Sequence, residues 1–154
     1  MPWRALDHTA DAALEVSAGT WPALLEEAAL AFGQWITDGH LPGGAHETER
    51  AFELGPFAPL DPLDPLDNGD RVPTWVGFWR ALHRLWTVEG FLPVHARVAL
   101  VDTTAGALVR VRAGCISAGA LDLAHVLDVK AVTWHAAAVT ERDGRWTGVI
   151  VLDL

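Results

Sequence analysis

The chain has 154 residues, of which 51% are hydrophobic and 20% charged, and its formal net charge is −9 at pH 7. These values predict one folded domain over residues 1–154 and exclude a disordered chain. Phosphate backbones are bound mainly through Lys and Arg, yet acidic residues outnumber these basic residues by 20 to 11. Direct, tight nucleic-acid binding is therefore not expected, and a protein partner, a cation or both suit the charge better.

The distribution of apolar residues and cysteine indicates the compartment. No apolar run approaches the roughly 20 residues needed to cross a bilayer, and the N-terminal segment has acidic residues in place of an apolar signal core. The single cysteine, Cys115, excludes an internal disulfide and fits a reducing compartment. We expect a cytoplasmic protein with no membrane partner, and we expect Cys115 to be a small buried strand residue rather than a nucleophile.

The first half of the chain predicts a strand, a helix and a second strand. A strand is expected over Ala12–Val16. Thr20 can cap the following helix, which has a Pro in its first turn and apolar residues at helical spacing up to Ile36. Asp38-Gly39 is expected to end this helix, and residues 49–54 are expected to form a short strand.

Residues 55–73 contain five Pro and a tandem Pro-Leu-Asp repeat at 59–67. Because Pro removes backbone donors, this segment predicts an exposed loop. Its acidic residues do not have the spacing of an EF-hand, so a solvated acidic loop is preferred to a calcium loop.

A second helix is expected to begin at Thr74 and to end before Gly90, with a buried stripe rich in Trp. Its other side carries Arg80, His83, Arg84 and Thr87. On so acidic a protein this basic patch is a candidate docking face, although a solvated helix surface is the simpler interpretation. Most of the eight tryptophans fall on predicted core stripes, so we assign them to packing rather than to base stacking.

The remaining sequence predicts two hairpins. Val94–Asp102 and Ala107–Ala113 flank one turn, and Val129–Arg142 and Arg145–Leu152 flank Asp143-Gly144, a strong hairpin signal. Residues 121–125 are expected to form a loop or a short helix. Together these elements predict an α+β fold, in which two helices pack on a mostly antiparallel β-sheet.

The Asp143-Gly144 turn also predicts a register. A two-residue turn pairs Arg142 with Arg145, which places Asp153 opposite Trp134 and on the same face as Lys130. A bulge in either strand would change this alignment.

Asp153 interrupts an otherwise apolar strand, and a buried carboxylate needs a partner. Solvent at the strand end, an ion pair with Lys130 and a bound metal all remain open explanations. Hard cations prefer carboxylates and carbonyls, which Asp7, Asp11, Asp153 and the terminal Leu154 can supply. His8 and His135 lack the companions of a zinc site, and the sequence has neither a P-loop nor a dinucleotide-binding glycine motif.

Five sequence strings carry a resemblance to a known family. They are DHTAD at 7–11, LEEAALAF at 25–32, TVEG at 87–90, VKAVTWH at 129–135 and the terminal LDL. In this order, and at both ends of the chain, they resemble the archease family, small activators of the RtcB-type RNA-splicing ligase.

The resemblance implies both site residues and a role. Asp11, Asp153 and the main-chain oxygen of Leu154 match the family's ligands for a divalent cation, which is assigned as calcium, with Mg²⁺ or Mn²⁺ as alternatives. Lys130 matches the lysine tied to activity, and we group Asp7 and His8 with it as residues that contact the partner. The implied role is that of a tRNA-splicing accessory factor that is not itself an enzyme: it promotes guanylylation of the ligase and allows multiple turnover.

The chain also departs from the family pattern, and two other functions stay open. Residues 75–81 of the second helix lack the usual carboxylate, Trp134 stands where Tyr is common, and the Pro-Leu-Asp repeat looks like an insertion. One alternative is a divalent-metal-dependent hydrolase that uses Asp7, His8, Asp11 and Asp153. The other is a general chaperone-like modulator of RNA- or DNA-processing proteins.

Overall fold

The computed structural model describes residues 2–6, 11–57 and 71–154. In chain order these residues form β1 (Trp3–Leu6), β2 (Ala12–Ala18), α1 (Trp21–Ile36), β3 (Glu47–Phe57), α2 (Val72–Thr87), β4 (Phe91–Thr103), β5 (Gly106–Ser117), β6 (Ala131–Arg142) and β7 (Arg145–Asp153). Two short 3₁₀ helices, Ala118–Ala120 and Leu123–His125, connect β5 to β6. None of the helices in these ranges is long and apolar enough to cross a membrane.

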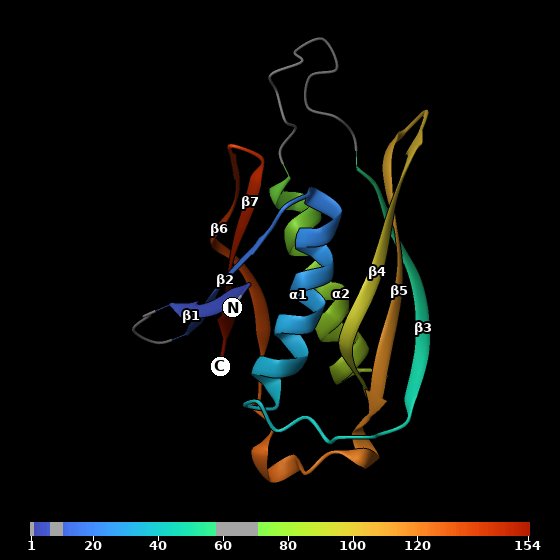
Figure 1. The fold of residues 1–154 in the computed structure, drawn as a ribbon, viewed down its shortest axis with the longest axis vertical. Helices are drawn as coiled ribbons and strands as arrows, with labels where there is room; N and C mark the ends of the chain where they lie inside the picture. Colours follow the sequence, from blue (N-terminus) through green and yellow to red (C-terminus); the bar gives the residue numbers. More distant parts are fainter. Residues whose placement is uncertain (1, 7–10, 58–70) are drawn as a thin grey trace.

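The described strands form two antiparallel sheets, with the orders β1-β2-β7-β6 and β3-β5-β4. The helices lie between them, as Figure 1 shows: α1 contacts β2 and β4, and α2 contacts β6, β4 and β3. The predicted α+β class is confirmed, but the strands are divided between two sheets rather than joined in one. This is possible because small buried residues widen the buried surface of α1 beyond a single stripe; they are Ala28, Ala29, Ala31 and Gly33.

The local signals in the first half of the chain are confirmed. The Thr20 hydroxyl accepts a hydrogen bond from the Ala23 backbone N–H at 3.2 Å and so caps α1. The helix ends at Ile36, and Asp38 and Gly39 follow with φ of 50° and 75°. The predicted first strand extends two residues further, to Ala18.

The boundaries of the proline-rich segment differ from the prediction. The Gly55-Pro56 peptide is cis, and the pairing with β5 shifts there before Phe57 pairs with Ala107. β3 therefore continues past residue 54, and the predicted loop does not begin at 55. At the other end, α2 starts at Val72, two residues before Thr74, with Pro73 in its first turn. The Pro-Leu-Asp repeat at 59–67 lies outside the described residues.

Trp75 of α2 packs against the four-stranded sheet, and Trp79 packs against Trp75 and against Phe32 of α1. Trp75 and Trp79 are fully buried and meet edge to face, with their ring centroids 5.6 Å apart. The Trp75 indole N–H donates to the Val149 carbonyl oxygen of β7 at 2.9 Å. The same ring lies over Gly148, where an added Cβ would be only 2.5 Å from the nearest indole carbon. Gly148 is therefore required for the close approach of α2 to β7.

The predicted register of the last hairpin is correct near the turn and wrong at the chain end. Arg142 pairs with Arg145, and the alignment holds as far as Ala138 and Val149. Beyond an irregularity in β6, Asp153 pairs with Ala131, not with Trp134. The reason is that residues 134–137 of β6 face only one residue of β7, and Ala136 within them has a left-handed φ of 56°. The register therefore places Asp153 on the face of Ala131 and Thr133, and it does not support a shared face with Lys130.

We predict that Gly148→Ala destabilises the fold. The new methyl group would collide with the Trp75 ring, and overpacking of this kind costs about 1–3 kcal/mol. Denaturant unfolding followed by fluorescence measures the change in the free energy of unfolding. Gly43→Ala is the control because an added Cβ there meets nothing within 4 Å. Equal stability of the two variants would contradict the packing argument.

Candidate functional site

The candidate site lies where the start of β2 meets the end of β7. β2 and β7 are neighbouring antiparallel strands, and their last pair is Ala12 with Leu152. Asp11 directly precedes the first of these residues, and Asp153 directly follows the second. Residues that are opposite on paired strands share a face, so a register continued by one residue would set Asp11 opposite Asp153.

Lys130 adjoins the same end of the sheet from the β6 side. Its backbone N–H donates to the Asp153 carbonyl oxygen at 2.8 Å. Lys130 is exposed, and no ion pair joins it to an acidic side chain in the described ranges. The preceding carbonyl, that of Val129, is 2.7 Å from Nε2 of His83 on α2. His83 thus connects α2 to the segment that leads into β6. The sequence had indicated a solvated helix surface there instead.

The donor groups at this end suit a hard divalent cation. Ca²⁺ takes about six to eight oxygen ligands. The carboxylates of Asp11 and Asp153 and the terminal main-chain oxygen of the exposed Leu154 offer part of that set. Within the described residues, no group of three or more His, Cys, Asp or Glu side chains is placed to hold a metal. Asp7 and His8 lie outside those residues. The ligand roles of Asp11, Asp153 and Leu154 therefore stay a prediction.

Cys115 is fully buried in β5, as predicted. Burial raises the pKa of its thiol to about 11. The thiol is therefore protonated at neutral pH, and its Sγ lies 3.7 Å from the Ala113 carbonyl oxygen. A protonated, inaccessible thiol is a poor nucleophile, so Cys115 contributes to packing.

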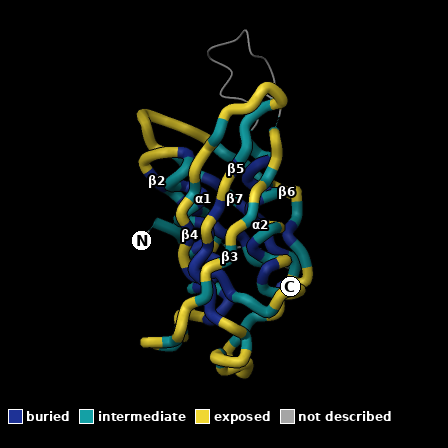
Figure 2. The backbone as a smooth tube through the Cα atoms, turned by 90° about the vertical axis from the view of Figure 1, so that its right-hand side faces the viewer, coloured by how far each residue is buried: buried dark blue, intermediate teal, exposed yellow. Residues whose placement is uncertain are grey.

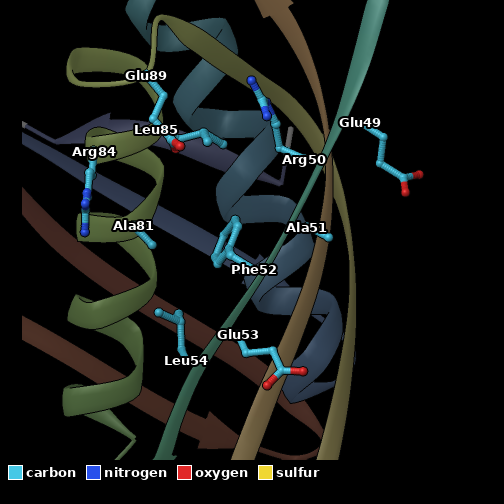
Figure 3. A pocket seen from close by; sticks show the side chains of 10 residues that line it. All are labelled: Glu49, Arg50, Ala51, Phe52, Glu53, Leu54, Ala81, Arg84, Leu85 and Glu89. Atoms are coloured by element: carbon cyan, nitrogen blue, oxygen red, sulfur yellow. The ribbon is translucent and has the colours of Figure 1, made fainter.

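A groove between α2 and β3, shown in Figure 3, was not predicted from the sequence. Its volume is about 410 Å³. Its apolar lining comes from Phe52 and Leu54 of β3 and from Ala81 and Leu85 of α2, and its polar lining includes Arg50, Arg84 and Glu89. Arg84 belongs to the predicted basic patch, but the groove itself depends on how α2 packs beside β3.

Comparisons with known proteins agree with this architecture. The sequence model of the Archease protein family (MTH1598/TM1083) matches residues 3–58. The chain is 33% identical over 157 residues to "Protein archease" of Methanopyrus kandleri strain AV19, and the match covers all of both chains. It also resembles the solution structure of Methanobacterium thermoautotrophicum protein 1598, with a TM-score of 0.70, 22% identity and 99% of each chain covered. An archease and possible chaperone from Thermotoga maritima, TM1083, has a TM-score of 0.51 at 18% identity, over 98% of this chain and 96% of that one.

The likeness to the two solved structures, at 22% and 18% identity, is a likeness of fold. The match to the Methanopyrus kandleri protein is a match of sequence over the whole of both chains, so it shows the family as well as the fold. The chain belongs to the archease family.

We predict that native Cys115 does not react with a thiol reagent such as Ellman's reagent near pH 8, because it is buried and protonated. The same thiol should react at once in guanidinium chloride. Since folding raises its pKa from 9.0 to about 11, its contribution to stability is complete below pH 9 and is lost as the pH rises towards 11. Rapid reaction of the folded protein would contradict the assignment to packing.

Proposed function

We propose that the chain is an accessory protein that activates an RtcB-type tRNA-splicing RNA ligase. It would promote guanylylation of the ligase and multiple turnover without being an enzyme itself. One observation supports the proposal most directly. Asp11, Asp153 and Lys130 belong to family motifs that lie far apart in the sequence, yet they lie at adjoining ends of β2, β7 and β6. Membership of the archease family supports it.

The residues at the chain ends suggest how such activation would work. Asp11, Asp153 and the terminal oxygen of Leu154 would hold a divalent cation, most simply Ca²⁺. When bound, this cation would neutralise negative charge near the nucleotide phosphates of the ligase. The exposed ammonium group of Lys130 would approach the ligase or its nucleotide from the adjacent strand. The partner contacts of Asp7 and His8 belong to the same proposal.

A guanylylation assay tests the function. The ligase from the same genome is incubated with labelled GTP, with and without this protein, and the fraction of guanylylated ligase and the number of turnovers are measured. Activation predicts a rise in both quantities. No change in either would end the proposal. A rise only in the amount of soluble, folded ligase would favour the chaperone-like alternative, which the description of the Thermotoga maritima protein as a possible chaperone also raises.

We predict that the C-terminus takes part in cation binding. Asp153→Asn, and separately a short tag added after Leu154, should each weaken Ca²⁺ binding at least tenfold because each removes or displaces an oxygen donor. Calorimetric titration of Ca²⁺ measures the affinity without any need for the ligase. Asp102→Asn is the matched control because it removes an exposed carboxylate from β4. Affinity unchanged in all three variants would remove Asp153 and Leu154 from the ligand set.

We predict that Lys130→Ala keeps the fold and loses activation. The side chain is exposed, and its backbone hydrogen bond to Asp153 does not need the ammonium group. The melting temperature should change little, whereas stimulation of ligase guanylylation should fall by roughly tenfold or more, as for a charged contact at an interface. Arg142→Ala, an exposed cation at the other end of β6, is the control. Lost stability with normal activation of the folded variant would make Lys130 a structural residue.

A further inference from the structure

α2 exposes one side of its surface between two strands of different sheets. It contacts β6 on one flank and β3 on the other, and in Figure 2 it lies between them. Arg80 and Arg84 are both exposed and stand one turn apart on this side. The α2 face, as we name it, consists of these two arginines, Trp134 of β6, Arg50 of β3 and the groove between α2 and β3.

Trp134 is the aromatic residue that protrudes from this face. It is 50% exposed, whereas Trp75 and Trp79 are fully buried. The irregular segment 134–137 carries it out of the regular pairing of β6 with β7. The Arg80 guanidinium carbon lies 5.6 Å from the centre of its ring, which holds the indole in place by a cation–π contact. Exposed Trp and Arg side chains of this kind are enriched at the centres of protein–protein interfaces.

The arginines of the α2 face have no acidic partners among the described residues. Arg50 packs over the Phe91 ring at 4.0 Å, and its buried Nε has no hydrogen-bond partner in the described part of the chain. Arg80 contacts Trp134, and Arg84 forms no ion pair within the same ranges. By contrast, Arg4 and Arg110 are paired with Glu15 and Glu53. In a chain of net charge −9, an unneutralised set of arginines on one side is complementary to acidic side chains.

The groove adds an apolar recess beside these charges. In Figure 3, Phe52 and Leu54 point from β3 towards α2, while Glu49 points away. A volume of about 410 Å³ is large enough to accept side chains of a partner. Arg50 and Arg84 line the same groove, so an apolar side chain that enters it would bring a neighbouring carboxylate within reach of a guanidinium group.

We propose that the α2 face binds an acidic segment of a protein partner. An apolar side chain of the segment would enter the groove, its carboxylates would meet Arg50, Arg80 and Arg84, and Trp134 would pack at the margin. This proposal rests on the proposed function, under which the partner is the ligase. A nucleic acid fits less well because the floor of the groove is apolar and offers phosphates nothing, whereas an apolar side chain of a protein segment can fill it.

The test compares the affinity of the ligase for the wild-type protein with its affinity for Trp134→Ala and Arg84→Glu. Each substitution should weaken binding by roughly tenfold or more, as expected for interface anchors. Arg84→Gln removes the positive charge without adding a negative one, so it separates these two effects of Arg84→Glu near the end of α2. Arg97→Glu is the control with the same charge change, since Arg97 is exposed on β4 and also lacks an ion pair within the described residues. Circular dichroism confirms that each variant is folded.

The outcomes separate the two proposals. If the wild-type protein stimulates guanylylation but Trp134→Ala and Arg84→Glu bind the ligase as tightly as Arg97→Glu does, the α2 face is not the docking surface and the proposed function stands. If Arg84→Glu weakens binding of a single-stranded RNA oligonucleotide and leaves ligase binding unchanged, the face recognises phosphate and the proposal is overturned. If the wild-type protein neither binds nor stimulates the ligase, both proposals fail.

Discussion

The pairing of β7 with β2 on one side and with β6 on the other is the constraint on which the candidate site depends. β7 is the last strand of the chain, and it lies inside its sheet between an N-terminal strand and the hairpin partner. Through this position the residues just before β2, just before β6 and at the end of β7 reach one end of the sheet. The same strand carries Gly148 and accepts the Trp75 indole hydrogen bond. It therefore positions α2 as well as the chain ends.

Local signals in the sequence predicted most of the elements, and non-local pairing explains what they missed. Thr20, Asp38-Gly39 and Asp143-Gly144 act within a few residues, so their effects could be inferred from the sequence. The division of the strands into two sheets depends on which surfaces of α1 become buried. The spacing of apolar residues in α1 predicted only one buried stripe. The extended register of the last hairpin failed for a similar reason. No glycine marks Ala136, yet its left-handed backbone realigns the whole end of β6.

The residues of the candidate site were likewise predicted in part, whereas their arrangement in space was not. Asp11, Asp153 and Lys130 were singled out by their unusual places in the sequence and by the family resemblance, but their proximity follows from strand order, which no short motif encodes. The groove was missed altogether. Phe52 and Leu54 have the alternation of an ordinary strand, and only the position of α2 beside β3 leaves them half-buried at a groove. The tryptophans were assigned to packing, whereas Trp134, in the irregular segment of β6, is half-exposed.

The two proposed surfaces are connected by short-range contacts, which bears on how docking and activation would cooperate. His83 of α2 contacts the Val129 carbonyl, and the next residue, Lys130, donates its backbone N–H to Asp153. A partner held on the α2 face would thus meet the carboxylates at the chain ends across a few rigid contacts rather than through a flexible linker. Because pre-orientation lowers the entropic cost of bringing reacting groups together, docking energy gained at the α2 face can be used to position Lys130 and a bound cation. The separation of arginines on one surface from aspartates at the chain ends would also let one acidic protein bind an acidic partner and still present a cation to it.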